Sequence, residues 1–176
     1  MMFQSELWLI LHEEEQKHIL EKFYYEFQFN PNIKNELPPF KFQIPVNVYD
    51  INDSRIYNDD ETINNLIKSI FIECMNNDDF MYVLDWQHTC FRYNPRVNTV
   101  TKSPVFVEDG RYKYGGYNVY FPSFYPNGDY YFFIAKDFRW GYLTHPWLEK
   151  VWIFGDKLIT LFKKSYRELD FIPCTL

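Results

Sequence analysis

Three segments of the chain place apolar side chains at the spacing of an amphipathic helix, with polar side chains between them. In the first segment Ile19, Phe23 and Phe27 would share one face, because positions three and four apart meet on the same side of a helix. The same spacing recurs twice further along the chain. We therefore predict three helices, near residues 13–28, 61–75 and 156–167.

Short runs rich in β-branched and aromatic residues, bounded by turn residues, predict strands in the second half of the chain. These runs cover residues 80–86, 88–93, 105–107, 117–121, 129–135 and 150–154.

Turn and breaker residues refine this strand pattern. The turn signal at residues 125–129 favours a hairpin between residues 117–121 and 130–135. Residues 40–48 contain Pro45, which lacks a backbone donor, so we predict an edge strand or an extended arm there. Residues 137–147 are rich in Trp, Gly, His and Pro, and we expect them to be irregular.

The order of these elements favours an α+β fold, because the strands cluster in the second half with helices around them. We predict a mainly antiparallel sheet from residues 80–154, with about three helices packed on it. A chain of 176 residues fits one domain, and no repeat, low-complexity run or linker divides it. The prediction is a single globular domain over residues 1–176.

Aromatic residues make up 22% of the chain. Such side chains fill cores and also form contact surfaces, so their number does not decide between these two roles.

Cys74, Cys90 and Cys174 are widely spaced and form no CxxC pair, so we expect free thiols in a reducing compartment. The first residues lack the basic start of a secretory signal. No stretch approaches the roughly 20 apolar residues of a membrane helix. We expect a cytoplasmic protein without a membrane segment.

The net charge of −6 is unevenly distributed along the chain. Residues 1–88 hold 16 acidic and 6 basic residues, whereas the rest of the chain carries an excess of basic residues. Nucleic-acid binding needs a basic face, so an acidic half argues against it. The acidic half suits a basic protein partner, because complementary charge steers encounter. The alternative is that the acidic residues only maintain solubility.

Chemically capable side chains are densest in residues 137–147, which contain a carboxylate, a guanidinium, an imidazole and two indoles. No nucleophile motif, zinc-protease motif or phosphate-binding loop accompanies them. We therefore expect no catalytic residue and no cofactor. An anchoring role is favoured for His145, because a lone imidazole usually satisfies local hydrogen bonds.

Two alternatives remain open at this point. One is a small hydrolase or transferase centred on Asp129, Asp137 and His145, with the imidazole as general base. The other is a ligand-binding module in which Trp140 and Trp147 form the pocket.

Metal ligands show no recognisable spacing in the sequence. His88 and Cys90 would share one face of a strand, but two ligands are too few to define a zinc site. The acidic residues 59–61 lack the spacing of a calcium loop and are typical of a helix cap. We predict no metal site.

Four short motifs occur in order in the C-terminal half: Pro-x-Gly-Asp-Tyr, Asp-Phe-x-Trp-Gly, His-Pro-Trp and Phe-Gly. They lie at residues 126–130, 137–141, 145–147 and 154–155, within a region of about 117–162. Through these motifs the chain resembles a bacterial family of domains of unknown function, numbered twenty-seven-sixteen. It also resembles the YokJ-like immunity proteins of LXG toxin systems.

The resemblance implies a non-enzymatic antitoxin, which would bind a nuclease-type toxin domain inside the producing cell. The acidic half is compatible with the basic substrate cleft of such a domain. The residues that we predict to contact the partner are Asp59, Asp60, Glu61, Asp137, Arg139, Trp140, His145 and Trp147.

Overall fold

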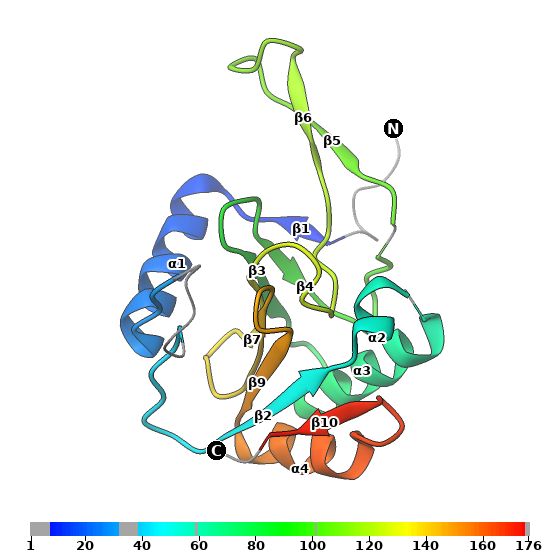
Figure 1. Cartoon of the computed structure of the whole chain (residues 1–176). Helices are drawn as coiled ribbons and strands as arrows, with labels where there is room; N and C mark the ends of the chain where they lie inside the picture. The colour runs from blue at the N-terminus through cyan, green and yellow to red at the C-terminus, as the bar shows by residue number, and fades with distance from the viewer. Residues whose placement is uncertain (1–7, 32–38, 59, 101, 175–176) are drawn as a thin grey trace.

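The computed structural model describes residues 8–31, 39–58, 60–100 and 102–174. Its centre is an eight-stranded antiparallel sheet, in the order β1-β4-β3-β7-β8-β9-β2-β10, with helices on both faces (Figure 1). The predicted α+β class is therefore confirmed. The elements are β1 (Leu9–Ile10), α1 (Glu13–Phe27), β2 (Val46–Ile51), α2 (Asp53–Tyr57), α3 (Glu61–Cys74), β3 (Met81–Asp85), β4 (Phe91–Tyr93), β5 (Val105–Glu108), β6 (Gly116–Val119), β7 (Tyr131–Ala135), β8 (Gly141–His145), β9 (Lys150–Phe154), α4 (Asp156–Ser165) and β10 (Phe171–Pro173).

The two faces of the sheet form two separate hydrophobic cores, because successive strand side chains point to opposite sides. In β3, Val83 belongs to the core that contains α3 and α4, whereas Leu84 belongs to the core that contains α1. Aromatic rings dominate both cores. Phe23 of α1 stacks on Phe132 at 4.3 Å, and Phe71 of α3 stacks on Phe133 at 5.9 Å between ring centroids. Filling two cores therefore accounts for much of the aromatic content.

The three predicted helices are present as α1, α3 and α4, and the short helix α2 was not predicted. The N-terminal cap of α3 is Asp60, whose carboxylate accepts hydrogen bonds from the backbone N–H groups of Thr62 and Ile63. This geometry satisfies donors that have no partner within the helix. Asp59 lies outside the described residues.

The predicted hairpin between residues 117–121 and 130–135 is wrong. Strand β6 pairs with β5 in a two-stranded sheet of its own, and β7 pairs with β3 and β8. The chain does bend within residues 125–129, but this segment lies in a connection between two different sheets. Long-range pairing with β3 decided the position of β7, and local turn chemistry cannot reveal that partner.

Two further strand predictions need correction. Residues 137–147 are not irregular throughout, because β8 occupies Gly141–His145 and lies between β7 and β9. Strand β2 is not at an edge, because it pairs with both β9 and β10. Pro45 precedes β2 and so removes no hydrogen bond from it.

Strands β5 and β6 form an arm, defined here as residues 105–120, that projects from the body of the molecule (Figure 1). The base of the arm lies near β1 (Figure 1). A two-stranded hairpin is marginally stable by itself, so contacts with the rest of the molecule must hold it in place.

Within the part of the chain that the structure describes, no helix combines the length and the apolar character that a membrane crossing requires.

The turn from β9 into α4 generates a prediction about stability. Gly155 has a φ of +94°, and an added Cβ would lie 2.5 Å from Trp140 Cβ and 2.8 Å from the Arg139 carbonyl oxygen. We expect Gly155→Ala to lower the free energy of unfolding by at least about 2 kcal/mol, from backbone strain and from this clash. The melting temperature should fall by about 4 °C or more.

The matched control is Gly110→Ala, because an added Cβ at Gly110 meets nothing within 4 Å. Differential scanning calorimetry of both variants measures the two melting temperatures. Equal melting temperatures for the two variants would contradict the packing described here.

Candidate functional site

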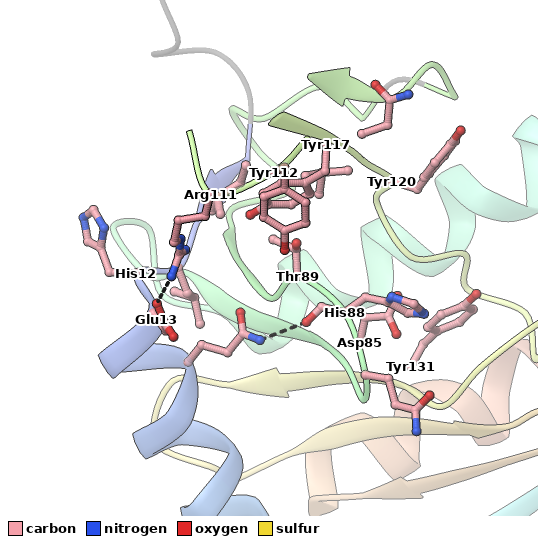
Figure 2. Close-up of a pocket in the computed structure, with 16 residues that line it drawn as sticks. His12, Glu13, Asp85, His88, Thr89, Arg111, Tyr112, Tyr117, Tyr120 and Tyr131 are labelled. Atoms are coloured by element: carbon pink, nitrogen blue, oxygen red, sulfur yellow. Dashed lines mark hydrogen bonds and ion pairs between the residues drawn. The ribbon is translucent and has the colours of Figure 1, made fainter. Parts of the chain in front are cut away.

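The described residues form a concave pocket of about 930 Å³. It lies between the arm, the start of α1 and the end of β3, and Figure 2 shows its lining residues. The walls are mainly polar and aromatic. Glu13 and Arg111 form an ion pair at 3.3 Å on one side, and Tyr112, Tyr120 and Tyr131 contribute rings.

One group of titratable side chains lies at the edge of this pocket: Asp85, His88 and Asp129. Each offers one oxygen or nitrogen atom, and these atoms lie within 4.8 Å of one another. His88 Nε2 is 3.6 Å from Asp129 Oδ2. In Figure 2 the side chains of Asp85 and His88 lie close together, beside Tyr131.

The pairing of β3 with β7 brings these residues together. Asp85 is the last residue of β3 and lies opposite Tyr131, the first residue of β7, so Asp129 follows closely beyond the paired region. His88 is three residues after Asp85, and its backbone N–H donates to the Asp85 carbonyl in a turn. Two strand ends and one turn therefore meet at a single point.

The loop that carries His88 is fixed to helix α1 through one side chain, Gln16. The Gln16 amide donates to the His88 carbonyl at 2.9 Å and accepts from the backbone N–H of Cys90 at 3.1 Å. Gln16 therefore satisfies two backbone groups of the loop and holds its main chain against the helix. The imidazole of His88 remains largely exposed.

The carboxyl group of Asp85 is in an unfavourable environment for its charged form. Its residue is only 8% exposed, and Oδ1 accepts no hydrogen bond from any described residue. Burial, followed by repulsion from Asp129, raises the pKa of Asp85 from 3.8 to about 7, although a backbone hydrogen bond from Gln87 opposes the change. A perturbed carboxyl group in a cleft is a typical feature of a functional site.

This group of side chains can attract a cation or exchange a proton near neutral pH. The nearby Cys90 thiol is a poor nucleophile, because burial raises its pKa to about 12 and so disfavours the thiolate. Two carboxylates and an imidazole are a chemically reasonable donor set for a divalent metal ion.

The described members of the predicted partner-contacting set have different surroundings in the fold. Asp60 caps α3 and pairs with Arg55, and Glu61 lines a different, smaller pocket. Asp137 and Arg139 pair with each other in the turn after β7, far along that strand from Asp129.

Trp140 and His145 are unavailable to a partner in this structure. Trp140 is 3% exposed and stacks on Phe71 at 5.7 Å. His145 is fully buried. Only Trp147, of these aromatic candidates, is exposed, and its ring packs edge-on against Tyr130.

The ring of His145 is an internal anchor. Nδ1 accepts the backbone N–H of Leu148 at 3.2 Å, so the neutral ring carries its proton on Nε2, which lies 3.2 Å from the hydroxyl oxygen of Tyr130. Burial lowers the pKa of His145 from 6.5 to about 4. The imidazole is therefore neutral at pH 7 and closes a bend between β8 and β9.

The sequence interpretation missed Asp85 altogether and considered His88 and Asp129 only separately. The available signal was an aspartate at the end of a buried apolar strand, directly before a turn. Its significance depends on the partner strand, which the sequence pattern did not identify.

Comparisons with known proteins confirm the resemblance to the family of domains of unknown function. The family described as Protein of unknown function (DUF2716) matches residues 10–159. An uncharacterised protein of Bacillus subtilis (strain 168), YxiI, is 40% identical over 81 residues. That alignment covers 46% of this chain and 42% of the relative. No solved structure matches the chain.

The environment of Asp85 predicts an unusual pH dependence of stability. Because its folded-state pKa is raised, the folded state binds the additional proton between about pH 4 and pH 7, and stability falls as pH rises through that interval. A shift from 3.8 to about 7 corresponds to a penalty on the order of 4 kcal/mol. Asp85→Asn should remove it. We expect this variant to melt above the wild type at pH 8 in buffer with EDTA.

At pH 4 most of the advantage of Asp85→Asn should disappear, because the Asp85 carboxyl group of the folded wild type is then protonated and as neutral as the amide of the variant. Asp137→Asn, which changes a half-exposed carboxylate, is the control and should show no such crossover. A pH-independent difference between Asp85→Asn and the wild type would refute the burial of charge at this position.

The anchoring role of His145 predicts that His145→Ala lowers stability by about 1–3 kcal/mol, because the buried hydroxyl of Tyr130 and the half-buried backbone N–H of Leu148 lose their partners on the ring. The loss of stability should be largest above pH 6.5 and should shrink as pH falls toward 4. In that interval the unfolded wild type binds a proton on His145 but the folded wild type does not, so the wild type loses stability and the variant does not. Thermal unfolding at pH 7.5 and pH 5 measures both effects. His18→Ala, on the exposed face of α1, serves as control. Equal melting temperatures for the two variants would be inconsistent with an anchor.

Proposed function

We propose that this chain, which belongs to the family described as Protein of unknown function (DUF2716), is a non-enzymatic binding protein that acts as an immunity protein in the cytoplasm. Its partner in this proposal is a basic toxin domain. The observation that carries the proposal is the group of exposed aromatic side chains on the arm: Phe106, Tyr112, Tyr114 and Tyr120. Aromatic residues are enriched at the centres of protein interfaces.

The conformation of the arm favours binding, because its contacts hold it before a partner arrives. Arg111 pairs with Asp109 inside the arm at 2.8 Å and with Glu13 of α1 at 3.3 Å. The rings of Tyr112 and Tyr117 lie 4.8 Å apart across the arm. A surface that is ordered in advance loses less conformational entropy when it binds.

The charge beside the arm supports a basic partner. Glu13 and Asp85 line the pocket, and Asp129 lies beside Asp85. Arg111, which also lines the pocket, is already paired with two carboxylates. A lysine or arginine side chain of the partner would therefore meet negative charge at this pocket.

The two alternatives receive less support. In the hydrolase alternative Asp129 and Asp137 would have to act together, but they lie at opposite ends of β7, and His145 is buried away from solvent. In the ligand-binding alternative Trp140 and Trp147 would have to share a pocket. Trp140 instead packs on α3, whereas Trp147 packs on Tyr130.

A rescue and binding experiment tests the proposal. The toxin domain encoded beside this chain's gene would be co-expressed with it in a host cell, and growth would be measured. Affinity would be measured with the purified domain. We expect growth rescue by the wild type and at least tenfold weaker affinity for Tyr114→Ala and Tyr120→Ala, as for aromatic residues at the centre of an interface.

Tyr25→Ala is the matched control, because Tyr25 is 83% exposed on α1 and Tyr114 is 82% exposed on the arm. The control should bind as the wild type does. An absence of both rescue and binding would refute the immunity function. Equal losses for Tyr25 and Tyr114 would refute the arm as the interface.

A further inference from the structure

We infer that Asp85, His88 and Asp129 form a binding site for one divalent transition-metal ion, at the edge of the pocket beside the arm. The inference concerns a property beyond partner binding, and it holds or fails independently of the immunity proposal. It rests on the geometry of the three side chains, on an unpartnered buried oxygen, and on the hydrogen bonds that fix the surrounding main chain.

The separation of the three donor atoms suits a single ion. Metal bonds of about 2.1 Å place two ligand atoms about 3.0–4.2 Å apart, depending on the angle between them. The distance between His88 Nε2 and Asp129 Oδ2 is 3.6 Å, which is inside that interval. All three donor atoms lie within 4.8 Å of one another, so side-chain adjustments of about 1 Å or less would bring every pair inside that interval.

The buried, unpartnered carboxyl group of Asp85 distinguishes this site from a cluster of acidic residues on the surface. The residue is more than nine-tenths buried and lines the pocket, and its Oδ1 has no hydrogen-bond partner among the described residues. A buried polar atom without a partner costs free energy. A second carboxylate nearby increases that cost, whereas a bound cation would remove both penalties.

Outer hydrogen bonds orient the ligands as they do in known metal sites. Asp129 Oδ1 accepts the backbone N–H of Tyr130 at 2.7 Å, which leaves Oδ2 directed toward His88. Gln16 fixes the main chain of the loop on both sides of Thr89, through His88 and Cys90. Two of the three ligands therefore have their positions set from outside the cluster.

The donor set indicates the class of metal. Two carboxylate oxygens suit Mn²⁺, and one imidazole nitrogen adds affinity for Zn²⁺, which binds more tightly than Mn²⁺ to most such sites. Mg²⁺ and Ca²⁺ prefer all-oxygen surroundings and should bind more weakly. Three protein ligands leave a coordination position for solvent or a small ligand from the pocket.

Equilibrium dialysis of the full chain against Mn²⁺ and Zn²⁺ tests the site, with bound metal measured by atomic emission. We expect one ion per chain, with Zn²⁺ bound more tightly than Mn²⁺. Asp85→Asn and Asp129→Asn should each weaken binding at least tenfold, because loss of even an outer-shell partner has an effect of this size. His88→Gln should weaken Zn²⁺ binding more than Mn²⁺ binding.

The controls are Asp137→Asn and His18→Gln, which remove the same chemical groups elsewhere and should bind as the wild type does. The Mn²⁺ measurement excludes binding through thiols, for which Mn²⁺ has little affinity. Thermal unfolding in EDTA verifies that each variant is folded. The inference is overturned if neither ion binds saturably with a dissociation constant below about 1 mM. It is equally overturned if Asp85→Asn and Asp129→Asn bind both ions as tightly as the wild type.

Discussion

The antiparallel pairing of β3 with β7 is the constraint on which the rest of this structure depends. Both strands lie inside the sheet and are covered on both faces, so their side chains build the two aromatic cores at once. The register places Asp85 opposite Tyr131, and this places Asp129 beside the turn that carries His88. The same interaction that organises the fold therefore also assembles the candidate site.

The site formed by Asp85, His88 and Asp129 has too little positive charge to balance its carboxylates. Burial and a neighbouring carboxylate both disfavour the ionised form of Asp85, and none of the described residues compensates Oδ1. A metal ion would supply that charge, and so would a basic side chain of a bound partner. The metal-site inference therefore rests on this electrostatic feature, whereas the immunity proposal rests on the aromatic side chains of the arm and gains only the choice of a basic partner from it.

Local pattern sufficed for the parts of the fold that local interactions determine. The helices α1, α3 and α4 follow from apolar periodicity, and the α+β class follows from the order of elements. Apolar periodicity and element order could not predict which strands pair, because contacts between residues far apart in the sequence decide the pairing. The hairpin assigned to residues 117–121 and 130–135 failed for that reason, as did the irregular assignment that concealed β8.

The candidate site residues also divide into those that a local motif indicates and those that only long-range contacts reveal. The side chains that attracted attention through their density in residues 137–147 proved to be partly architectural, with His145 and Trp140 buried in the cores. Asp85 carries no local motif, and its importance comes from burial and from Asp129, which is 44 residues later in the sequence. Burial and long-range proximity are the properties that a single sequence expresses least directly.

The central claim is that β3 and β7 hold a buried, uncompensated carboxylate at the mouth of the pocket. Its most direct test is a pH titration in metal-free buffer, in which NMR records the chemical shift of the Asp85 carboxyl carbon. We expect a midpoint near 7, because burial and the neighbouring Asp129 both disfavour the ionised carboxylate. A midpoint near the ordinary value of 3.8 would contradict it, because the carboxylate would then be solvated or already paired.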